Sequence, residues 1–529
     1  MAPSFDLVSE PWIPCIRLDG SSDELGLLDT LVQAHELREV VDASPLVTAS
    51  LHRLLLAILH RNFGPRNLNA WRELWEAGQF EDEVLAAYFD KWRHRFDLFD
   101  EERPFYQRAG MEGVKYHPFA VFAEEMSSGN NPALFAHDTD SEPASFSPAR
   151  AAALVIAMQN YDLSGTRSNP DGSGPAYPDA APLALGFAFV PIGDTLFHTL
   201  MLNFITEDPI LNDQLGVNDA DLPAWEREDA PSVTERYPDG YIDYLTWQAR
   251  CLHLSAEDLA SGQMEVRSAV RAAGEDFAGP LGEVDPMIAY VRNESARSND
   301  TPYTAYKGRV DRTLWRDSMV LLRDAEGRSQ RPPVLNHVAQ VAKALGLPRS
   351  TGLSLWALGL VRGAQAAKVE YWRHERFPLP LRYLADDELV DYLQECLALT
   401  EGVHGSLYGA TCALAEQALT AGVRDADSTA VGEFVRSLGV SADYWSSLEL
   451  PFRELVVELA AEDTDRFARE LKWVELLRRT AWQVFERSES SLAANARNLR
   501  AISHARRVLG GSLRKQLAAF EEVNESHAD

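Results

Sequence analysis

Apolar residues at helical spacing dominate the chain from about Asp386 to its C-terminus. Residues three or four positions apart lie on one face of an α-helix, and such an apolar face has to be buried against a neighbour. The clearest stripe follows steps of +4, +3, +3, +4 and +3 and consists of Phe467, Leu471, Val474, Leu477, Ala481 and Val484. The pattern predicts antiparallel helices with short links, as in a helical bundle. They are expected over residues 386–399 running on into 406–421, 428–438, 448–477 extending through 485, and 491–520.

The sequence before this region mixes helical and strand patterns. Ser44 and Pro45 are a typical N-cap and first helical residue, and the apolar positions after them predict a helix that ends at Gly64-Pro65. Helical spacing also covers 68–96 and 148–159, the latter with Ser147 as N-cap, and strand character covers 5–18, 185–192, 264–270 and 287–292. We expect an α+β fold, with a large mixed N-terminal α/β body over residues 1–385 and a C-terminal antiparallel four-helix bundle over residues 386–529.

Two segments of the N-terminal body lack any periodicity and are rich in small and polar residues. They span residues 127–140 and 162–179. Long irregular segments inside a compact body often carry binding residues, but a surface insertion without a function has the same composition. Composition alone leaves both interpretations open.

Charge is unevenly distributed along the chain. The formal net charge is −30, which is unusual for a protein that binds bare nucleic acid by itself. Residues 466–515, however, contain twelve Lys or Arg against four Glu and no Asp, a local charge of +8 that leaves −38 for the rest. Such a basic segment on an acidic body is typical of an interaction surface, and Arg478-Arg479 and Arg506-Arg507 are its candidate contacts. The alternative is a basic helical face that packs against an acidic domain or subunit.

The sequence motifs of common enzymes are absent. The chain has neither a phosphate-binding G-x-x-x-x-G-K-[ST] loop nor an H-E-x-x-H motif, and its carboxylates are too numerous for one acid–base pair to stand out. The four cysteines form no C-x-x-C pair, so neither a zinc ribbon nor a disulfide framework is expected. We predict no metal and no cofactor.

The chain also lacks the sequence signals of a membrane protein. No run of about 18 apolar residues occurs, so no membrane span is expected. The first residues do not combine a basic segment with an apolar one, which is the pattern of an export signal. A cytoplasmic location is therefore expected.

Three segments of the chain resemble one protein family. They are the opening Phe5–Pro14, the segment Arg103-Pro104-Phe105-Tyr106-Gln107, and Gly363-Ala364-Gln365-Ala366-Ala367, which is expected inside a helix-like stretch that ends at Arg373-His374. The second is similar to an H-P-F-x-Q motif, with Arg103 in place of the histidine. In order and spacing all three resemble the CasA family, the large subunit of the type I-E CRISPR surveillance complex Cascade.

The resemblance implies a non-catalytic protein that acts within a complex. It implies recognition of the protospacer-adjacent motif (PAM) on double-stranded target DNA and help in opening the duplex, so that the guide RNA can pair and form an R-loop. The implied partners are the 5′ handle of the guide RNA, other Cascade subunits and the helicase–nuclease that the complex recruits.

The resemblance also assigns single residues to DNA contact. Gln365 matches a glutamine wedge that inserts beside the PAM and starts strand separation, with Ala364 and Ala366 on either side. Arg271 matches a lysine that enters the minor groove, where base readout is degenerate, so tolerant PAM selection is expected. Arg292 matches a position where relatives carry basic residues near DNA.

Two loops match loops of the family. The segment from Gly165 to Ser168 matches a glycine-rich loop whose backbone approaches the PAM because glycine lacks a Cβ, and Ser168 stands where the pattern has its second glycine. Residues 129–137 match a loop that docks near the guide RNA handle. The candidate contacts there are Asn131, Phe135 and His137. An exposed Phe135 suits insertion between partners or base stacking, and the alternative is that it packs on its own core.

Two other functions stay open. A purely structural scaffold subunit would use the helical bundle only to pack on its partners. An enzyme of unknown chemistry would require a perturbed carboxylate or histidine in a closed apolar pocket. Some relatives carry a metal-binding cysteine cluster in the middle of the chain, where this sequence has only Cys251, so no structural zinc is expected.

Overall fold

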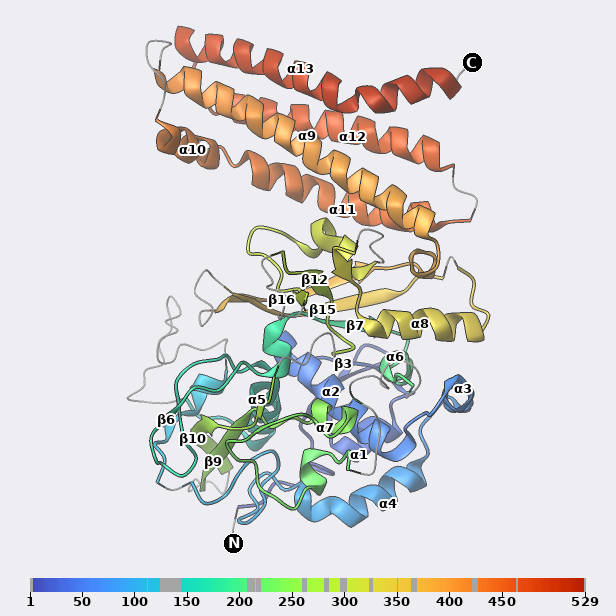
Figure 1. Cartoon of the computed structure of the whole chain (residues 1–529), viewed down its shortest axis with the longest axis vertical. Helices are drawn as coiled ribbons and strands as arrows, with labels where there is room; N and C mark the ends of the chain where they lie inside the picture. Colours follow the sequence, from blue (N-terminus) through green and yellow to red (C-terminus); the bar gives the residue numbers. More distant parts are fainter. Residues whose placement is uncertain are drawn as a thin grey trace. The chain divides into compact units, whose positions relative to one another are not determined.

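Figure 1 shows the computed structural model of the chain, coloured from blue at the N-terminus to red at the C-terminus. The structure describes residues 3–111, 113–123, 144–206, 215, 220–258, 264–279, 285–294, 302–322, 327–349, 351–362, 369–420, 427–462 and 465–527. The chain divides into two compact units. The first consists of Met1–Leu347 and Leu353–Phe377, and the second of Pro348–Gly352 and Pro378–Asp529.

A long buried helix, α2 (Pro45–Phe63), runs through the first unit, and every residue of it up to His60 is buried. Its predicted start is confirmed, although the Ser44 side chain makes no capping hydrogen bond. Helix α5 (Pro148–Tyr161) packs against α2. Here the predicted cap is made, since Ser147 Oγ accepts a hydrogen bond from Arg150 N at 3.2 Å. These two helices form the centre of the first unit.

The helical pattern over residues 68–96 corresponds to two helices instead of one. They are α3 (Leu68–Ala77) and α4 (Asp82–Trp92), followed by the short 3-10 helix η1 (Arg93–Arg95). Gly78 ends α3 because it adopts a left-handed conformation with φ of +73°, which glycine tolerates and other residues rarely adopt. Gly78 therefore ends a helix within a stretch whose apolar periodicity alone predicts one continuous helix.

One sheet of the first unit carries two of the predicted DNA contacts, Ser168 and Arg271. Its strands run in the order β4 (His117–Pro118), β10 (Met264–Ala273), β5 (Arg167–Ser168) and β6 (Pro175–Ala176), and β9 (Arg250–Asp258) also pairs with β10. The strand character predicted over 264–270 is confirmed. The segment 162–179, predicted as a loop, contains the short antiparallel hairpin of β5 and β6.

A second sheet corrects the sequence analysis. Its order is β16 (Val369–Pro378), β15 (Ser354–Arg362) and β7 (Ala188–Ile192). The expectation of a helix-like stretch that ends at Arg373-His374 is wrong, because both of these residues lie in strand β16. A short apolar run such as that of β15 suits a central strand as well as a buried helix, and only the neighbouring strands decide between them.

The remaining elements of the first unit are short. Strands β2, β1 and β3 form one group, β13, β12 and β14 another, and β8 pairs with β11. The bounds of these strands are β1 (Ile13–Arg17), β2 (Ser22–Leu25), β3 (Leu37–Val40), β8 (Glu235–Arg236), β11 (Asp276–Phe277), β12 (Tyr290–Arg292), β13 (Tyr303–Ala305) and β14 (Ser329–Gln330). The helices are α1 (Leu27–Val32), α6 (Leu196–Asn203), α7 (Tyr241–Leu245) and α8 (Pro333–Ala344).

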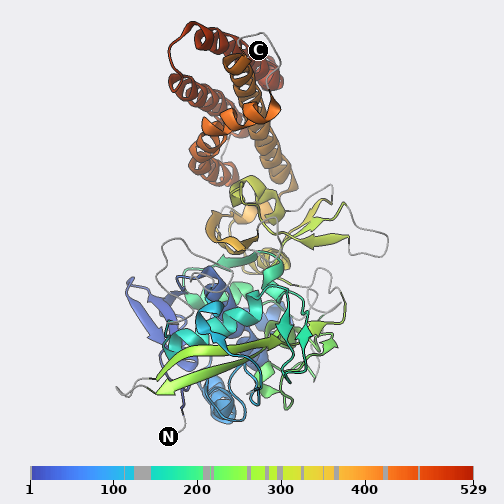
Figure 2. The same cartoon turned by 90° about the vertical axis from the view of Figure 1, so that its left-hand side faces the viewer.

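The second unit is helical, as the apolar stripes predict. Its described helices are α9 (Asp387–Thr420), α10 (Ser428–Ser437), α11 (Val440–Ala460), α12 (Arg466–Ser490) and α13 (Ala496–His527), and Figures 1 and 2 show them side by side. The stretch predicted as one helix over 448–485 is two, since Asp465 caps a new helix by accepting a hydrogen bond from Ala468 N. The described residues thus form four long helices and the short α10, where the sequence predicted four.

The mixed α+β class is confirmed. The main segment of the second unit begins at Pro378, ahead of the predicted bundle over residues 386–529. The 3-10 helix η6 (Leu381–Leu384) packs against α9, and Tyr383 Oη donates a hydrogen bond to Val456 O at 3.0 Å. Among the described helices, none is long and apolar enough to cross a lipid bilayer.

A buried ion pair joins distant parts of the first unit. Arg53 Nη1 of α2 lies 2.6 Å from Asp285 Oδ2, and each side chain is only 1% exposed. Tyr244 of α7 donates a hydrogen bond from Oη to the same carboxylate oxygen at 2.9 Å. The other oxygen, Oδ1, accepts from Met287 N at 2.8 Å. With its carboxylate oxygens satisfied, this pair fixes α2, α7 and the segment before β12 to one another.

We expect Asp285→Ala to destabilise the first unit by about 3–5 kcal/mol, because it leaves the Arg53 guanidinium buried without its counter-charge. Urea unfolding followed by circular dichroism measures the change. Asp90→Ala, at an exposed position on α4, is the matched control and should change stability by less than about 0.5 kcal/mol. Equal unfolding midpoints for the two variants would show that the pair is not a structural anchor.

Candidate nucleic-acid interface

Asp162, at the C-terminal end of α5, is the centre of the candidate site. Its side chain is 3% exposed and contacts three arginines, Arg167, Arg250 and Arg271. Arg167 Nη2 lies 3.0 Å from both carboxylate oxygens, and Arg271 Nη1 lies 3.1 Å from Oδ1. Arg250 donates from Nε to Oδ2. One carboxylate therefore holds three cations that come from different parts of the chain.

The three arginines differ in their access to solvent. The Arg250 side chain is fully buried and also donates to three backbone carbonyls, Leu163 O at 3.1 Å, Asp179 O at 2.7 Å and Ala249 O at 2.5 Å. Arg167 and Arg271 are 14% and 20% exposed. Because one negative charge faces three positive ones, the cluster keeps a formal charge of +2, and its two outer members carry that charge toward the surface.

Electrostatics keeps the Asp162 carboxylate ionised. Burial alone would raise its pKa, because a low dielectric disfavours the charged form. The positive charges of Arg271, Arg250 and Arg167 outweigh burial and hold the pKa of Asp162 below its usual range. The cluster therefore keeps its net positive charge throughout the neutral pH range.

Backbone pairing brings two of the predicted DNA contacts together. Strand β5 runs parallel to β10, and Ser168 lies opposite Ala272, next to Arg271. Gly165 begins the loop with φ of +153°, a conformation that residues with a Cβ rarely adopt. The glycine loop and the β10 arginine, more than 100 residues apart in sequence, thus lie at one edge of the sheet.

One further cation, Lys115, lies just before the neighbouring strand β4. His117 is paired with Ala269 of β10, and both His117 and Lys115 are exposed. Burial lowers the pKa of the His117 imidazole, and the charges of Lys115 and Arg271 lower it further. Because the charges of Lys115 and Arg271 both affect the His117 imidazole, these two cations lie close to it. This edge of the sheet is therefore locally positive although the whole chain is acidic.

Other predicted contacts lie elsewhere or outside the described residues. Arg292 is exposed at the end of β12, in a sheet that does not include β10, so the structure does not bring it into the Asp162 cluster. The wedge residues Ala364, Gln365 and Ala366 and the docking-loop residues Asn131, Phe135 and His137 lie outside the described residues. Their roles stay predictions.

The basic pairs of the helical unit are partly neutralised within that unit. Arg506 donates to both carboxylate oxygens of Glu489, with Nε 2.9 Å from Oε2. Arg478 Nη1 lies 3.6 Å from Glu475 Oε2. Arg479 and Arg507 are exposed, and among the described residues neither forms an ion pair. The local charge of +8 in the sequence therefore overstates the charge that a DNA strand would meet.

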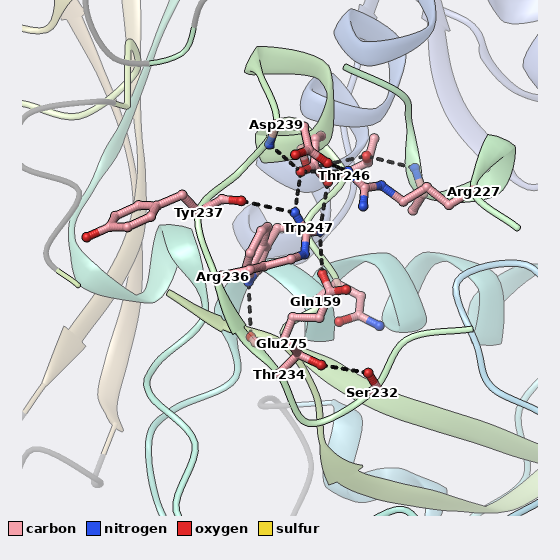
Figure 3. A network of polar contacts seen from close by, with 12 residues as sticks. Gln159, Arg227, Ser232, Thr234, Arg236, Tyr237, Asp239, Thr246, Trp247 and Glu275 are labelled. Atoms are coloured by element: carbon pink, nitrogen blue, oxygen red, sulfur yellow. Dashed lines mark hydrogen bonds and ion pairs between the residues drawn. The ribbon is translucent and has the colours of Figure 1, made fainter. Parts of the chain in front are cut away.

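The groups that would suggest an enzyme have structural roles here. Burial raises the pKa of Asp221 to about 6, yet its carboxylate accepts hydrogen bonds from Ile242 N and Asp243 N and so caps helix α7. Glu275, whose pKa burial also raises, forms an ion pair with Arg236 at 2.7 Å (Figure 3). Within the described parts of the chain, no group of three or more His, Cys, Asp or Glu is arranged to hold a metal ion.

Comparison with known proteins identifies the family. The family model of the CRISPR-associated protein Cse1 matches residues 6–484, which is most of the chain. This chain is a member of the Cse1 family. A CRISPR-associated protein CasA/Cse1 from Thermus thermophilus is 29% identical over 525 residues and covers 96% of each chain. The resemblance to CasA seen in the sequence is therefore confirmed.

Solved structures of the Cse1 family have the same fold. The crystal structure of Cse1 from Acidimicrobium ferrooxidans matches with a TM-score of 0.83 at 24% identity, over 98% of this chain and 99% of that chain. A chain of a structure described as a CRISPR RNA-guided surveillance complex matches with a TM-score of 0.75 at 22% identity, over 96% and 99% of the two chains. At these identities the likeness shows the fold alone.

Sequence reasoning missed the acidic centre of the site. It named Gly165, Ser168 and Arg271 but neither Asp162 nor Arg250, which the structure places among them. The only available signal was that Asp162 directly follows the predicted helix 148–159 and begins the predicted loop. A single aspartate among many carries little information until its partners are known.

We expect Asp162→Asn to destabilise the chain by about 3–5 kcal/mol at pH 7, because Arg250 then stays buried without a counter-charge. Since the folded-state pKa of Asp162 is depressed, its stabilising contribution is complete above the unfolded pKa of about 3.9 and is lost as the pH falls through the lower folded-state pKa. Urea unfolding measured from pH 7 down to pH 2 should show that the difference in free energy of unfolding between wild type and Asp162→Asn becomes smaller as the pH falls.

Asp90→Asn, at the exposed α4 position, is the control and should follow wild type over the whole pH range. A constant difference between Asp162→Asn and wild type from pH 7 to pH 2 would contradict the electrostatic account, since it would show that the carboxylate charge is not what stabilises the cluster.

Proposed function

We propose that this chain is the large subunit of a Cascade-type CRISPR surveillance complex, where it recognises the PAM on double-stranded DNA and helps to open the duplex. Family membership supports the place in the complex. The observation that carries the DNA-reading role is the Asp162 cluster, in which one buried carboxylate presents Arg271 beside the Gly165–Ser168 loop. The protein acts by binding and has no catalytic role.

In this proposal the cluster reads the minor groove of the PAM. The groove is narrow, so a glycine backbone and a partly exposed guanidinium suit it better than bulky side chains. The Arg271 guanidinium is held by Asp162 and loses less freedom on binding than a solvated arginine would. Because the minor groove distinguishes mainly A·T from G·C, selection of the PAM would be tolerant.

Opening of the duplex is assigned to Gln365 with its neighbours Ala364 and Ala366. These residues belong to the connection between strands β15 and β16, so a wedge there would be presented from a sheet. Unstacking a base step costs a few kcal/mol, and an inserted side chain can hold that step open. Beyond this step, the free energy gained by guide RNA pairing nearly equals the free energy lost with the DNA duplex. Opening of the first step therefore decides whether an R-loop forms.

The remaining contacts of the proposal involve other partners. Asn131, Phe135 and His137 would dock near the 5′ handle of the guide RNA and against other Cascade subunits, and Arg292 would lie near DNA. The helical unit would hold a DNA strand through its basic residues. Recruitment of the helicase–nuclease completes the proposed role. The second candidate is a pure scaffold subunit, whose DNA contacts would not matter.

Substitution in the reconstituted complex separates these two functions. We expect Gln365→Ala and Arg271→Ala each to abolish R-loop formation on a closed PAM-bearing duplex, because nucleation of strand separation fails. A duplex with a pre-opened bubble at the PAM-proximal end should restore R-loops in both. An electrophoretic mobility assay with permanganate footprinting measures the opening.

Arg66→Ala is the control, since Arg66 is an exposed arginine of the same unit. It should form R-loops as wild type does. If Gln365→Ala and Arg271→Ala also match wild type on the closed duplex, the chain is a scaffold and the DNA-reading role is wrong.

The helical unit allows a second comparison with matched charges. Arg479→Gln with Arg507→Gln removes two exposed cations without an ion pair in the described residues, whereas Arg478→Gln with Arg506→Gln removes two that are already paired. We expect the first pair to lower the slope of log K against log salt by about 1.8, since each phosphate contact contributes about 0.9. The second pair should lower it by less than about 0.9.

Fluorescence anisotropy of labelled target DNA on the reconstituted complex at several salt concentrations gives these slopes. Equal slopes for wild type and Arg479→Gln/Arg507→Gln would show that these arginines of the helical unit do not contact the DNA. The PAM-reading proposal would be unaffected.

A further inference from the structure

The segment Arg103–Gln107, which has no part in the proposed DNA contacts, lines a pocket in the first unit. We call this the Arg103 pocket and define it by its principal lining residues, which are Arg95, Arg103, Tyr106, Arg108, Trp225 and Gln248. Phe105 stacks on Trp225 at a centroid distance of 6.0 Å, and both are buried. The pocket thus combines a rigid aromatic wall with three guanidinium groups.

The backbone of the pocket is held in a defined and strained shape. Asp100 Oδ1 accepts hydrogen bonds from Glu102 N at 3.0 Å and from Arg103 N at 2.6 Å. Tyr106 has φ of +57° and is the only residue other than glycine with a positive φ in the described part of the chain. Gln159 Nε2 donates to Tyr106 O at 3.2 Å and secures this turn. Strain of this kind clusters at ligand sites, where the surrounding structure maintains it.

The three guanidiniums of the pocket have hydrogen-bond donors to spare. Each arginine carries five N–H donors. Arg95 Nη2 donates to Arg227 O at 2.9 Å and Arg108 Nη1 donates to Pro231 O at 2.5 Å. No described residue accepts a hydrogen bond from, or forms an ion pair with, the Arg103 guanidinium. Burial lowers the pKa of Arg95, and the positive charge of Arg103 lowers it further. The two like charges therefore lie close to one another, and the nearby Asp100 carboxylate, which accepts from the Arg103 backbone, offsets part of their effect on Arg95.

A nearby network shows what a purely structural arrangement of arginines looks like in this protein. Arg236 contacts Asp243 at 2.5 Å and Glu275 at 2.7 Å, and its guanidinium lies over the Trp247 ring (Figure 3). Arg227 contacts Asp239 at 2.6 Å and Asp243 at 2.8 Å. Each of these arginines forms ion pairs with two carboxylates, whereas within the described part of the chain neither Arg95 nor Arg103 forms one. The difference indicates that the Arg103 pocket is built to receive an anion from outside the chain.

We propose that the Arg103 pocket binds a phosphate group, with a nucleic-acid phosphodiester as the ligand that fits its charge. Guanidinium forks match the oxygen geometry of phosphate, and a wall of buried aromatic residues lowers the local dielectric and strengthens the attraction. Exposed Glu102 and Asp229 also line the pocket, so its lining residues carry a formal charge of +1, while Asp100 lies next to the pocket and is not one of its lining residues. A phosphodiester carries one negative charge and balances this value.

Calorimetric titration of the full chain with inorganic phosphate at pH 6, at constant ionic strength kept with chloride, tests the pocket. We expect binding to wild type that Arg103→Gln and Arg95→Gln each weaken at least tenfold, whereas Arg66→Gln, the exposed control, leaves it unchanged. Because Arg103 makes no side-chain hydrogen bond to described residues, Arg103→Gln should keep the wild-type circular dichroism spectrum and melting temperature without phosphate. In Arg271→Ala, which alters the other surface proposed to meet phosphate, the phosphate binding that depends on Arg103 and Arg95 should persist, so the result does not depend on the PAM-reading proposal.

Competition identifies the source of the phosphate. An eight-nucleotide RNA that displaces phosphate from wild type, when a peptide nucleic acid of the same sequence does not, assigns the pocket to a nucleic-acid backbone. If neither the RNA nor the peptide nucleic acid displaces phosphate, and phosphate binding still depends on Arg103, the pocket is a site for free phosphate. If phosphate binds wild type and Arg103→Gln equally, or if it binds neither, the proposal is overturned.

Discussion

Asp162 carries the electrostatic arrangement on which the candidate interface depends. Its carboxylate joins the end of α5, the hairpin of β5 and β6, and strands β9 and β10 through three arginines. Burying a carboxylate costs free energy unless a cation is paired with it. Here three positive charges surround one negative charge, so the carboxylate is more than neutralised. In the proposed function, this surplus positive charge is what attracts an anionic partner to this edge of the sheet.

Charge balance distinguishes the roles of arginines elsewhere in the molecule. Arg53 and Asp285 form a neutral buried pair that serves packing, and Arg236 is fully compensated by two carboxylates. In the Asp162 cluster and in the Arg103 pocket, cations outnumber the carboxylates that meet them. A count of local charges therefore separates arginines that stabilise the fold from those that are available to a ligand.

Such local surpluses explain how an acidic chain can be suited to a nucleic acid. At moderate salt, electrostatic fields decay within about 10 Å, so a phosphate at the sheet edge responds to Arg271 and Lys115 and not to the net charge of −30. The helical unit follows the same logic. Its basic segment is partly neutralised by Glu475, Glu486 and Glu489, so the cations without such partners define its binding capacity.

The sequence by itself determined the helical unit, the buried helices α2 and α5, and the family. Through the family resemblance it also predicts Arg271 and the Gly165–Ser168 loop as DNA contacts. Periodicity, caps and short motifs are local, and local information is present in the order of residues. Only the tertiary structure decided that residues 354–362 and 369–378 are strands, because their neighbours β7 and β15 supply the hydrogen bonds. It alone brought Asp162, Arg250 and Arg271 together, since contacts between residues about 90 and 109 positions apart leave no periodic trace. The same holds for the charge of the Arg103 pocket, which depends on which carboxylates fold close to an arginine and which do not.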